Sequence, residues 1–174
     1  MSQLKLNREP NGYLPLNLGW RGAFYKLSIA GGPYDYFPGK DTAFGVCVRA
    51  ERPGPCHVHL PIKDFGVPRD EYAVELAIRD TLRAAIRGQQ VYVGCMGGWG
   101  RTGLFLALLA KAAGVENPVE YVREHYSSRA VETADQENFV SDFDVMKLQS
   151  WLTRYAWSHR FPLVGRMFGW GGVV

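Results

Sequence analysis

The stretch Val93-Gly94-Cys95-Met96-Gly97-Gly98-Trp99-Gly100-Arg101-Thr102-Gly103 decides the fold of this 174-residue chain. A short β-like run precedes its glycine-rich loop, and an apolar run of helical character follows it. Glycines let successive backbone N–H groups converge on one point, and the N-terminus of a helix adds its dipole. The stretch therefore predicts a strand, an anion-binding loop and a helix in direct succession.

Two side chains in this stretch carry chemistry. Converging N–H groups would stabilise a thiolate at Cys95 and make it a nucleophile. Arg101 is planar and always charged, so it can hold two phosphoryl oxygens at once. A Cys-x5-Arg spacing alone is also compatible with a simple glycine turn, but the strand before it and the helix after it favour a phosphate-binding loop. The loop residues expected to bind the substrate, besides Arg101, are Met96, Gly97, Gly98, Trp99 and Gly100.

Working outward, the chain alternates strand and helix signals. Strands are expected at 43–48 and 56–60, and an amphipathic helix is expected from an Asp70 N-cap to Gly88. Beyond the loop, helices are expected at 101–113, at 118–125 and, as one long element, at 134–157. Residues 1–40 contain turn signals such as Asn11-Gly12 and Gly31-Gly32-Pro33 around one strand candidate at 23–29.

This alternation predicts an α/β fold with a central, partly parallel sheet flanked by helices. The length favours a single domain over 1–174, with an irregular or β N-terminal segment at 1–40 and a C-terminal tail at 158–174. The longest apolar run, 104–110, is too short to span a bilayer, and residues 1–10 do not resemble a signal peptide.

Composition limits the partners and the compartment. The formal net charge is +3, with no stretch that concentrates Lys and Arg, so we expect no nucleic-acid partner. The three cysteines, Cys47, Cys56 and Cys95, form a sparse and odd set that fits a reducing compartment, and we expect a cytoplasmic protein. Cys47 and Cys56 are expected to be buried and inert, or to form a protective disulfide with Cys95 on oxidation.

The loop resembles the signature of the cysteine-dependent protein tyrosine phosphatase superfamily, His-Cys-x-x-Gly-x-Gly-Arg-Thr-Gly, at every fixed position except the first. The resemblance implies a phosphocysteine intermediate at Cys95 and no metal or other cofactor. It also implies that the Thr102 hydroxyl hydrogen-bonds the cysteine sulfur. Gly94 replaces the histidine that, in the superfamily, helps to order the loop and to keep the cysteine acidic.

Two further segments resemble the superfamily. Ile62-Lys63-Asp64-Phe65-Gly66-Val67-Pro68 is similar to its acid loop, Trp-Pro-Asp-x-Gly-Val-Pro, which implies that Asp64 is the general acid and then the base. Asp70 is the competing carboxylate, but it is better explained as a helix cap. Val131-Glu132-Thr133-Ala134-Asp135-Gln136 is similar to the glutamine loop, which implies that Gln136 places the hydrolytic water.

The three segments lie in superfamily order between about 60 and 140 and resemble a compact, dual-specificity-like member. The resemblance implies hydrolysis of phosphate monoesters, with phosphotyrosine in proteins as the leading substrate. No Lys or Arg lies between Cys95 and Arg101, which argues against highly charged phosphoinositides. The alternatives are an inositol phosphate phosphatase and a silent phosphate-binding module, the latter motivated by Gly94 and by Glu132 in place of a glutamine.

Two weaker sequence patterns also bear on function. His57 and His59 alternate as a metal pair would, but no third ligand with suitable spacing accompanies them. The segment 151–170 interleaves aromatic and basic residues, which indicates either a helix and tail packed onto the core or a membrane-surface anchor.

Overall fold

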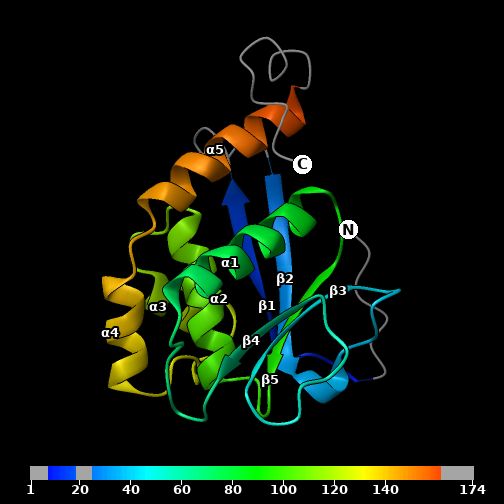
Figure 1. Cartoon of the computed structure of the whole chain (residues 1–174), viewed down its shortest axis with the longest axis vertical. Coiled ribbons are helices and arrows are strands. Elements are labelled where there is room, and N and C mark those ends of the chain that lie inside the picture. Colours follow the sequence, from blue (N-terminus) through cyan, green and yellow to red (C-terminus); the bar gives the residue numbers. More distant parts are fainter. Residues whose placement is uncertain (1–7, 19–24, 162–174) are drawn as a thin grey trace.

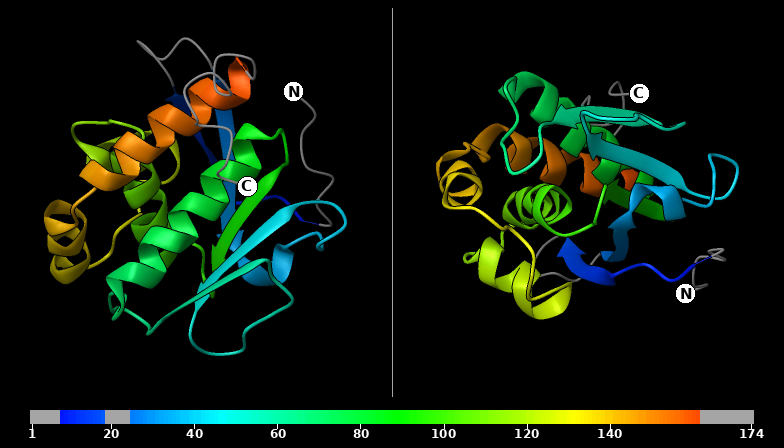
Figure 2. Two further views of the ribbon diagram at one scale, coloured as in Figure 1. Left: turned by 45° about the horizontal axis from the view of Figure 1, so that its top comes forward. Right: turned by 90° about the horizontal axis from the view of Figure 1, so that it is seen from below.

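The computed structural model describes residues 8–18 and 25–161 (Figure 1). Within these residues, five strands form one sheet with the order β1-β2-β5-β3-β4. β1 is antiparallel to β2, and the other neighbours are parallel, which confirms the expected partly parallel sheet. In the right view of Figure 2, β1 (blue) and β4 (teal) lie at opposite sides of the sheet. The strands are β1 (Gly12–Leu18), β2 (Tyr25–Pro33), β3 (Phe44–Arg49), β4 (Val58–Ile62) and β5 (Val91–Cys95).

Helices pack against this sheet and confirm the predicted α/β class. Asp70 caps the first helix as expected, because its Oδ1 accepts hydrogen bonds from two N–H groups of the first turn, at 2.9 and 3.2 Å. Within the described residues, no helix is long and apolar enough to cross a membrane. The helices are α1 (Glu71–Ile86), α2 (Gly100–Ala112), α3 (Pro118–His125), α4 (Ala134–Asp142) and α5 (Met146–Arg160), and a short 3₁₀ helix, η2, spans Tyr34–Tyr36.

The two faces of the sheet bury different side chains, because successive residues of a strand point to opposite faces. In β5, Val91 and Val93 point into the main core that the helices cover. Tyr92 points the other way and packs with Tyr34 and Cys47 in a smaller cluster. α2 is buried on almost every side, since it lies among the sheet and the other helices.

The C-terminal ends of the parallel strands lie side by side at one end of the sheet. Pro33 at the end of β2 pairs with Cys95 at the end of β5, so the segment after β2 starts level with the glycine-rich loop. The loops that follow β3 and β4 begin at the same end. Residues from four distant segments therefore gather there: Asp35, Glu51, Asp64 and Cys95.

The expectation of one helix over 134–157 is wrong, because α4 and α5 are separate. Phe143 has an extended backbone, with φ −61° and ψ 119°, and it interrupts the helix. The Nζ of Lys111 on α2 donates hydrogen bonds to the carbonyls of Val140, Ser141 and Phe143, at 2.8, 2.6 and 2.9 Å. The Lys111 ammonium group, from a distant helix, thus stabilises the free carbonyls at the C-terminal end of α4. Local apolar periodicity does not reveal this contact.

The N-terminal segment is more regular than expected. β1 is not expected from the sequence, because Asn11-Gly12 indicates a turn. Pro15 is tolerated within β1, since β1 is an edge strand. Gly31-Gly32-Pro33, expected as a turn, belongs to β2. Of the strand expected at 23–29, residues 23–24 lie outside the described residues and the remainder belongs to β2.

The aromatic segment at 151–170 is described only as far as residue 161. Trp151 and Tyr155 are buried in the main core, as the packing alternative predicted for this helix. Phe168 and Trp170, on which the surface-anchor alternative also depended, lie outside the described residues. The C-terminal tail expected at 158–174 is likewise described only in its first part.

Candidate active site

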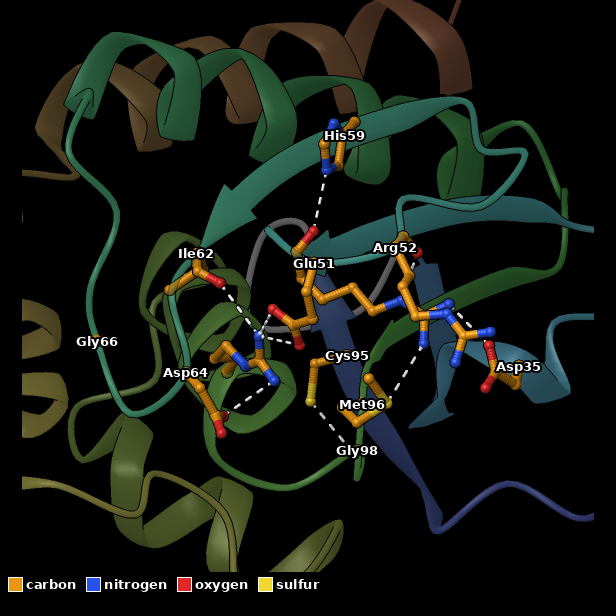
Figure 3. Close-up of polar contacts among 12 residues, drawn as sticks. Asp35, Glu51, Arg52, His59, Ile62, Asp64, Gly66, Cys95, Met96 and Gly98 are labelled. Atoms are coloured by element: carbon orange, nitrogen blue, oxygen red, sulfur yellow. Dashed lines mark hydrogen bonds and ion pairs between the residues drawn. The ribbon is translucent and has the colours of Figure 1, made fainter.

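The glycine-rich loop runs from Met96 to Trp99 between β5 and α2. Cys95 is 3% exposed, and its Sγ accepts a hydrogen bond from the N–H of Gly98 at 3.2 Å (Figure 3). Gly98 has a φ of +81°, and a Cβ at this position would lie 2.4 Å from the carbonyl carbon of Gly32. Glycine is therefore required here both by conformation and by space.

Arg101 is buried beside the loop and is held by acidic groups. Its Nη1 lies 2.7 Å from Oε1 of Glu51, and its Nη2 lies 3.0 Å from Oδ1 of Asp64. The carbonyl of Ile62 accepts a further hydrogen bond from Nη1, at 3.2 Å. In Figure 3, Glu51 and Asp64 lie on the same side of Cys95. The guanidinium is thus fixed by groups from two other loops, and such positioning is what binding of a phosphoryl group requires.

Glu51 is a site residue that sequence reasoning missed. It lies in the breaker cluster Glu51-Arg52-Pro53-Gly54-Pro55, which indicates only a turn. Its position two residues after the end of β3, a parallel strand, is the signal that could have found it. Burial alone would raise the pKa of Glu51, but hydrogen bonds from its own backbone and from Arg101, with nearby positive charge, hold this pKa below its ordinary value.

Glu51→Gln is expected to lower kcat/KM about tenfold near pH 6.5, because a misplaced Arg101 binds the transition state less well. Since folding lowers the pKa of Glu51, its charge stabilises the protein above the ordinary glutamate pKa, and this stabilisation is lost as pH falls through the lowered value. The difference in unfolding temperature between wild type and Glu51→Gln should therefore be largest above about pH 5 and should disappear at more acid pH. Kinetics and thermal unfolding across pH measure both effects. Glu116→Gln, on the exposed α2–α3 connection, is the control, and an identical difference at every pH would contradict the assignment.

Asp64 lies in the loop after β4, and Gln136 lies in the first turn of α4, which contacts that loop. The Asp64 side chain is 65% exposed, so a leaving group can reach it. Gln136 is fully buried; its Nε2 donates to the carbonyl of Gly66 at 3.2 Å, and its Oε1 accepts from the N–H of Glu132 at 2.9 Å. Both ends of the amide therefore contact backbone and join the acid loop to the glutamine loop. The role of Gln136 in placing water stays a prediction.

Three non-glycine residues of the described chain adopt left-handed backbone conformations, and all lie in loops around the site. They are Arg52, Phe65 and Val131, with φ of +50°, +55° and +58°. Each such residue costs about 1–3 kcal/mol and persists only where its surroundings enforce it. Each is the sequence neighbour of an acidic residue of these loops, namely Glu51, Asp64 and Glu132. Strained backbone is therefore found next to the carboxylates of these loops.

The remaining predicted residues line the loop at its helical end. Thr102 is buried, and within the described residues its Oγ1 has no hydrogen-bond partner, so the structure lacks the expected bond to the cysteine sulfur. The Trp99 ring lies under the guanidinium of Arg129, whose carbon is 3.7 Å from the ring centroid. The Glu132 carboxylate lies so close to Gly100 that a Cβ there would be 2.1 Å from Oε2.

The other cysteines and the two histidines belong to β3, β4 and the segment between these strands. All three cysteines are free thiols, and Cys47 is buried in the smaller cluster. His57 precedes β4 rather than lying on it, and its Nδ1 accepts a hydrogen bond from the N–H of Gly45 at 3.0 Å. A ring nitrogen of His59 lies within 3.0 Å of the Arg49 carbonyl. The two histidines therefore do not share a strand, contrary to the expectation.

Comparison with known proteins identifies the family. Residues 48–143, more than half of the chain, match the model of the Swiss Army Knife protein DSP-PTPase phosphatase domain, PTP-SAK. The chain belongs to this family. The PTP-SAK match contains Glu51, Asp64, Cys95, Arg101 and Gln136, and it confirms the predicted resemblance to compact, dual-specificity-like cysteine phosphatases.

Two curated relatives of this PTP-SAK chain are uncharacterized proteins of Methanocaldococcus jannaschii. One is 45% identical over 86 residues, which cover 49% of this chain and 58% of the relative. The other is 42% identical over 90 residues, which cover 52% of this chain and 56% of the relative. The chain thus spans just over half the length of the curated relatives that it matches.

Solved structures share the fold at low identity. Tk-PTP in its active form has a TM-score of 0.53 and 20% identity, covering 71% of this chain and 90% of its own. Kinase associated phosphatase (KAP) has a TM-score of 0.57 and 18% identity, covering 79% and 96%. PTPMT1 in complex with PI(5)P has a TM-score of 0.52 and 16% identity, covering 71% and 92%. These likenesses establish the fold of the PTP-SAK chain.

The absence of the superfamily histidine at Gly94 has a steric cause in this PTP-SAK chain. A Cβ at Gly94 would lie 2.7 Å from the carbonyl oxygen of Gly32 and 2.9 Å from Cα of Tyr34. Both are backbone atoms, which cannot move aside without displacing β2 or η2. A histidine therefore cannot occupy this position in the present fold.

Gly94→His is accordingly expected to destabilise the protein by about 3 kcal/mol or more, in the upper range for overpacking a core, without raising turnover. Urea unfolding and phosphate release from an aryl ester measure the two effects. Gly54→Ala is the control, because its Cβ would meet only the Tyr34 ring, 3.1 Å away. Unchanged stability with higher activity in the histidine variant would overturn this explanation.

Proposed function

We propose that this PTP-SAK chain hydrolyses phosphate monoesters through a phosphocysteine intermediate, with phosphotyrosine in proteins as its leading substrate. One observation carries the proposal: the Cys95 sulfur accepts a hydrogen bond from the N–H of Gly98 at 3.2 Å, in a loop that leads into α2, where Arg101 is buried and held by Glu51 and Asp64. A nucleophile, amide donors and a fixed cation within one loop are what phosphoryl transfer requires.

In the first step, the Cys95 thiolate attacks phosphorus and displaces the ester oxygen. The loop N–H groups and Arg101 hold the phosphoryl oxygens as their charge shifts. Asp64 gives its proton to the leaving oxygen, for which it must first leave Arg101, at 3.0 Å in the structure. The S–P bond forms as the P–O bond breaks, and the alcohol or phenol departs neutral.

In the second step, water attacks the phosphocysteine. Asp64, now a carboxylate, takes a proton from the water as it approaches phosphorus. The S–P bond breaks, the thiolate returns to Cys95, and inorganic phosphate leaves. No redox partner is needed, because every proton and electron pair is returned within the cycle.

The loop composition supports a phosphoprotein substrate. The residues between Cys95 and Arg101 carry no positive charge, unlike a pocket for a highly phosphorylated inositol. One observation favours the second candidate, an inositol phosphate phosphatase: the fold is shared with PTPMT1, which was solved in complex with PI(5)P. A direct comparison of a phosphotyrosyl peptide with PI(5)P therefore tests the proposed substrate class.

The test is phosphate release with a chelator present, from phenyl phosphate, 4-nitrophenyl phosphate, a phosphotyrosyl peptide and soluble PI(5)P. Wild type should hydrolyse the aryl esters and prefer the peptide to the lipid. Asp64→Asn should lower the rate on phenyl phosphate about 100-fold or more, and less on 4-nitrophenyl phosphate, whose leaving group needs less protonation. Asp41→Asn, on an exposed loop, is the control.

Each outcome separates the alternatives. A preference for PI(5)P would replace the protein substrate by the inositol phosphate. Folded wild type that binds inorganic phosphate without hydrolysing any ester would replace the enzyme by a silent binding module. An equal loss on both aryl esters in Asp64→Asn would remove Asp64 from the general-acid role.

A further inference from the structure

The peptide bond between Gly97 and Gly98 is held from outside the loop. Asn11 Nδ2 donates a hydrogen bond to the carbonyl of Gly97 at 2.9 Å. The described residues contain no cis peptide bond, and in a trans peptide the C=O and the following N–H point in opposite directions. With its carbonyl held by Asn11, this peptide must aim the N–H of Gly98 the other way, toward Cys95, where it lies 3.2 Å from Sγ.

The next peptide bond is held in the same manner. The hydroxyl of Tyr126 donates to the carbonyl of Gly98. The N–H of Trp99 therefore points away from Tyr126. Burial raises the pKa of Tyr126 far above its ordinary value, so the hydroxyl remains a donor at physiological pH.

The N-terminal strand makes this arrangement possible. Asn11 immediately precedes β1, and its N–H donates to the carbonyl of Gly31 at 2.8 Å, which places it above the end of β2. Tyr126 can lie close to β1 and β2 because Gly12 and Gly31 have no side chains. A Cβ at Gly12 would lie 2.4 Å from the Tyr126 carbonyl oxygen, and a Cβ at Gly31 would lie 2.7 Å from the Tyr126 ring. The glycines that indicate turns in the sequence thus provide room for the tyrosine.

The hydrogen bonds from Asn11 and Tyr126 matter because the glycine-rich loop is not stiff by itself. Gly97 and Gly98 are adjacent, and glycine backbones rotate freely. Without these hydrogen bonds, a peptide of the loop could turn its carbonyl toward the Cys95 sulfur. A carbonyl dipole there would repel both a thiolate and a phosphoryl oxygen. In the superfamily the histidine before the cysteine helps to order the loop, and Gly94 has no room for it.

We infer that Asn11 and Tyr126 are positioning residues that order the phosphate loop in place of the missing histidine. Asn11 lies outside the PTP-SAK match, so this chain obtains part of its loop ordering from its own N-terminal segment. The inference deepens the proposed function, on which it rests for its meaning in catalysis. The reactivity of the Cys95 thiol tests it without any turnover.

The experiment measures alkylation of Cys95 by iodoacetamide at pH 6 and pH 9, followed by mass spectrometry of the Cys95 peptide. The ratio of the two rates cancels differences in access and reports how well the loop stabilises the thiolate. Asn11→Ala and Tyr126→Phe should each lower the pH 6 to pH 9 ratio about tenfold, as expected when a charge loses one hydrogen bond. Asn17→Ala on the exposed side of β1 and Tyr72→Phe on α1 should leave the ratio unchanged.

Folding is checked by cooperative thermal unfolding. Asn11→Asp has the same shape without the N–H donors, and it replaces any variant that does not fold. An unchanged ratio in folded variants at both positions overturns the inference, whether or not the protein is an enzyme. Wild type that hydrolyses no ester overturns the proposed function alone, because the alkylation ratio still reports the loop.

Discussion

Cys95→Ser is expected to abolish phosphate release while leaving the protein folded and able to bind phosphate. A serine hydroxyl at pH 7 is almost entirely protonated, and no base in the loop is placed to activate it. Loss of a covalent nucleophile lowers kcat on the order of 10⁵-fold or more. Release of phosphate from 4-nitrophenyl phosphate measures the loss, and protection against thermal unfolding by inorganic phosphate measures retained binding.

Cys56→Ser is the matched control, since it makes the same substitution at a half-buried thiol outside the loop. It should retain wild-type turnover. Hydrolysis by Cys95→Ser at a rate near wild type would exclude the phosphocysteine mechanism and direct attention to water as the direct nucleophile.

Arg101→Lys is expected to lower kcat/KM about 10³-fold, although the charge is kept. A lysine ammonium is a point donor and cannot hold two phosphoryl oxygens in a plane as a guanidinium does. Loss of one hydrogen-bond donor that stabilises transition-state charge lowers kcat about 10²–10³-fold. The substitution also disturbs the contacts of Arg101 to Glu51 and Asp64. Steady-state kinetics on an aryl phosphate measure the effect.

Arg154→Lys, on an exposed position of α5, should behave as wild type in the same assay. The affinity for inorganic phosphate should fall less than kcat/KM in Arg101→Lys, because the guanidinium fork matters most in the transition state. Retention of more than a tenth of wild-type kcat/KM would show that the planar two-donor geometry of the guanidinium is not needed in that state.

Much of this architecture could be predicted from the sequence, because the relevant signals are local. The strand, glycine loop and helix around Cys95 follow one another within a short stretch, so their order alone places the nucleophile and Arg101. Asp70 caps α1 for equally local reasons. The position of Asp64 could be predicted only from a family resemblance, since nothing in its neighbours separates it from any other turn carboxylate.

What escaped prediction depends on contacts between distant segments. The break between α4 and α5 involves Lys111, about thirty residues earlier in the chain. Glu51 and Asn11 lie in segments that indicate only turns, and their roles exist only because parallel strands and the β1–β2 pair bring them to the loop. Hydrophobic periodicity reports which face is buried and carries no information about such partners.

The order of the strands limits how far the catalytic machinery can be transplanted. β5 lies in the middle of the sheet, with β2 on one side and β3 on the other, and the family-matched region 48–143 contains neither β2 nor most of β3. A piece cut at those borders would leave β5 with bare backbone donors and acceptors along both edges, a template for aggregation. The borders of sequence similarity are therefore not the borders of the folding unit, and a chimaera or minimal phosphatase should carry the N-terminal strands with it.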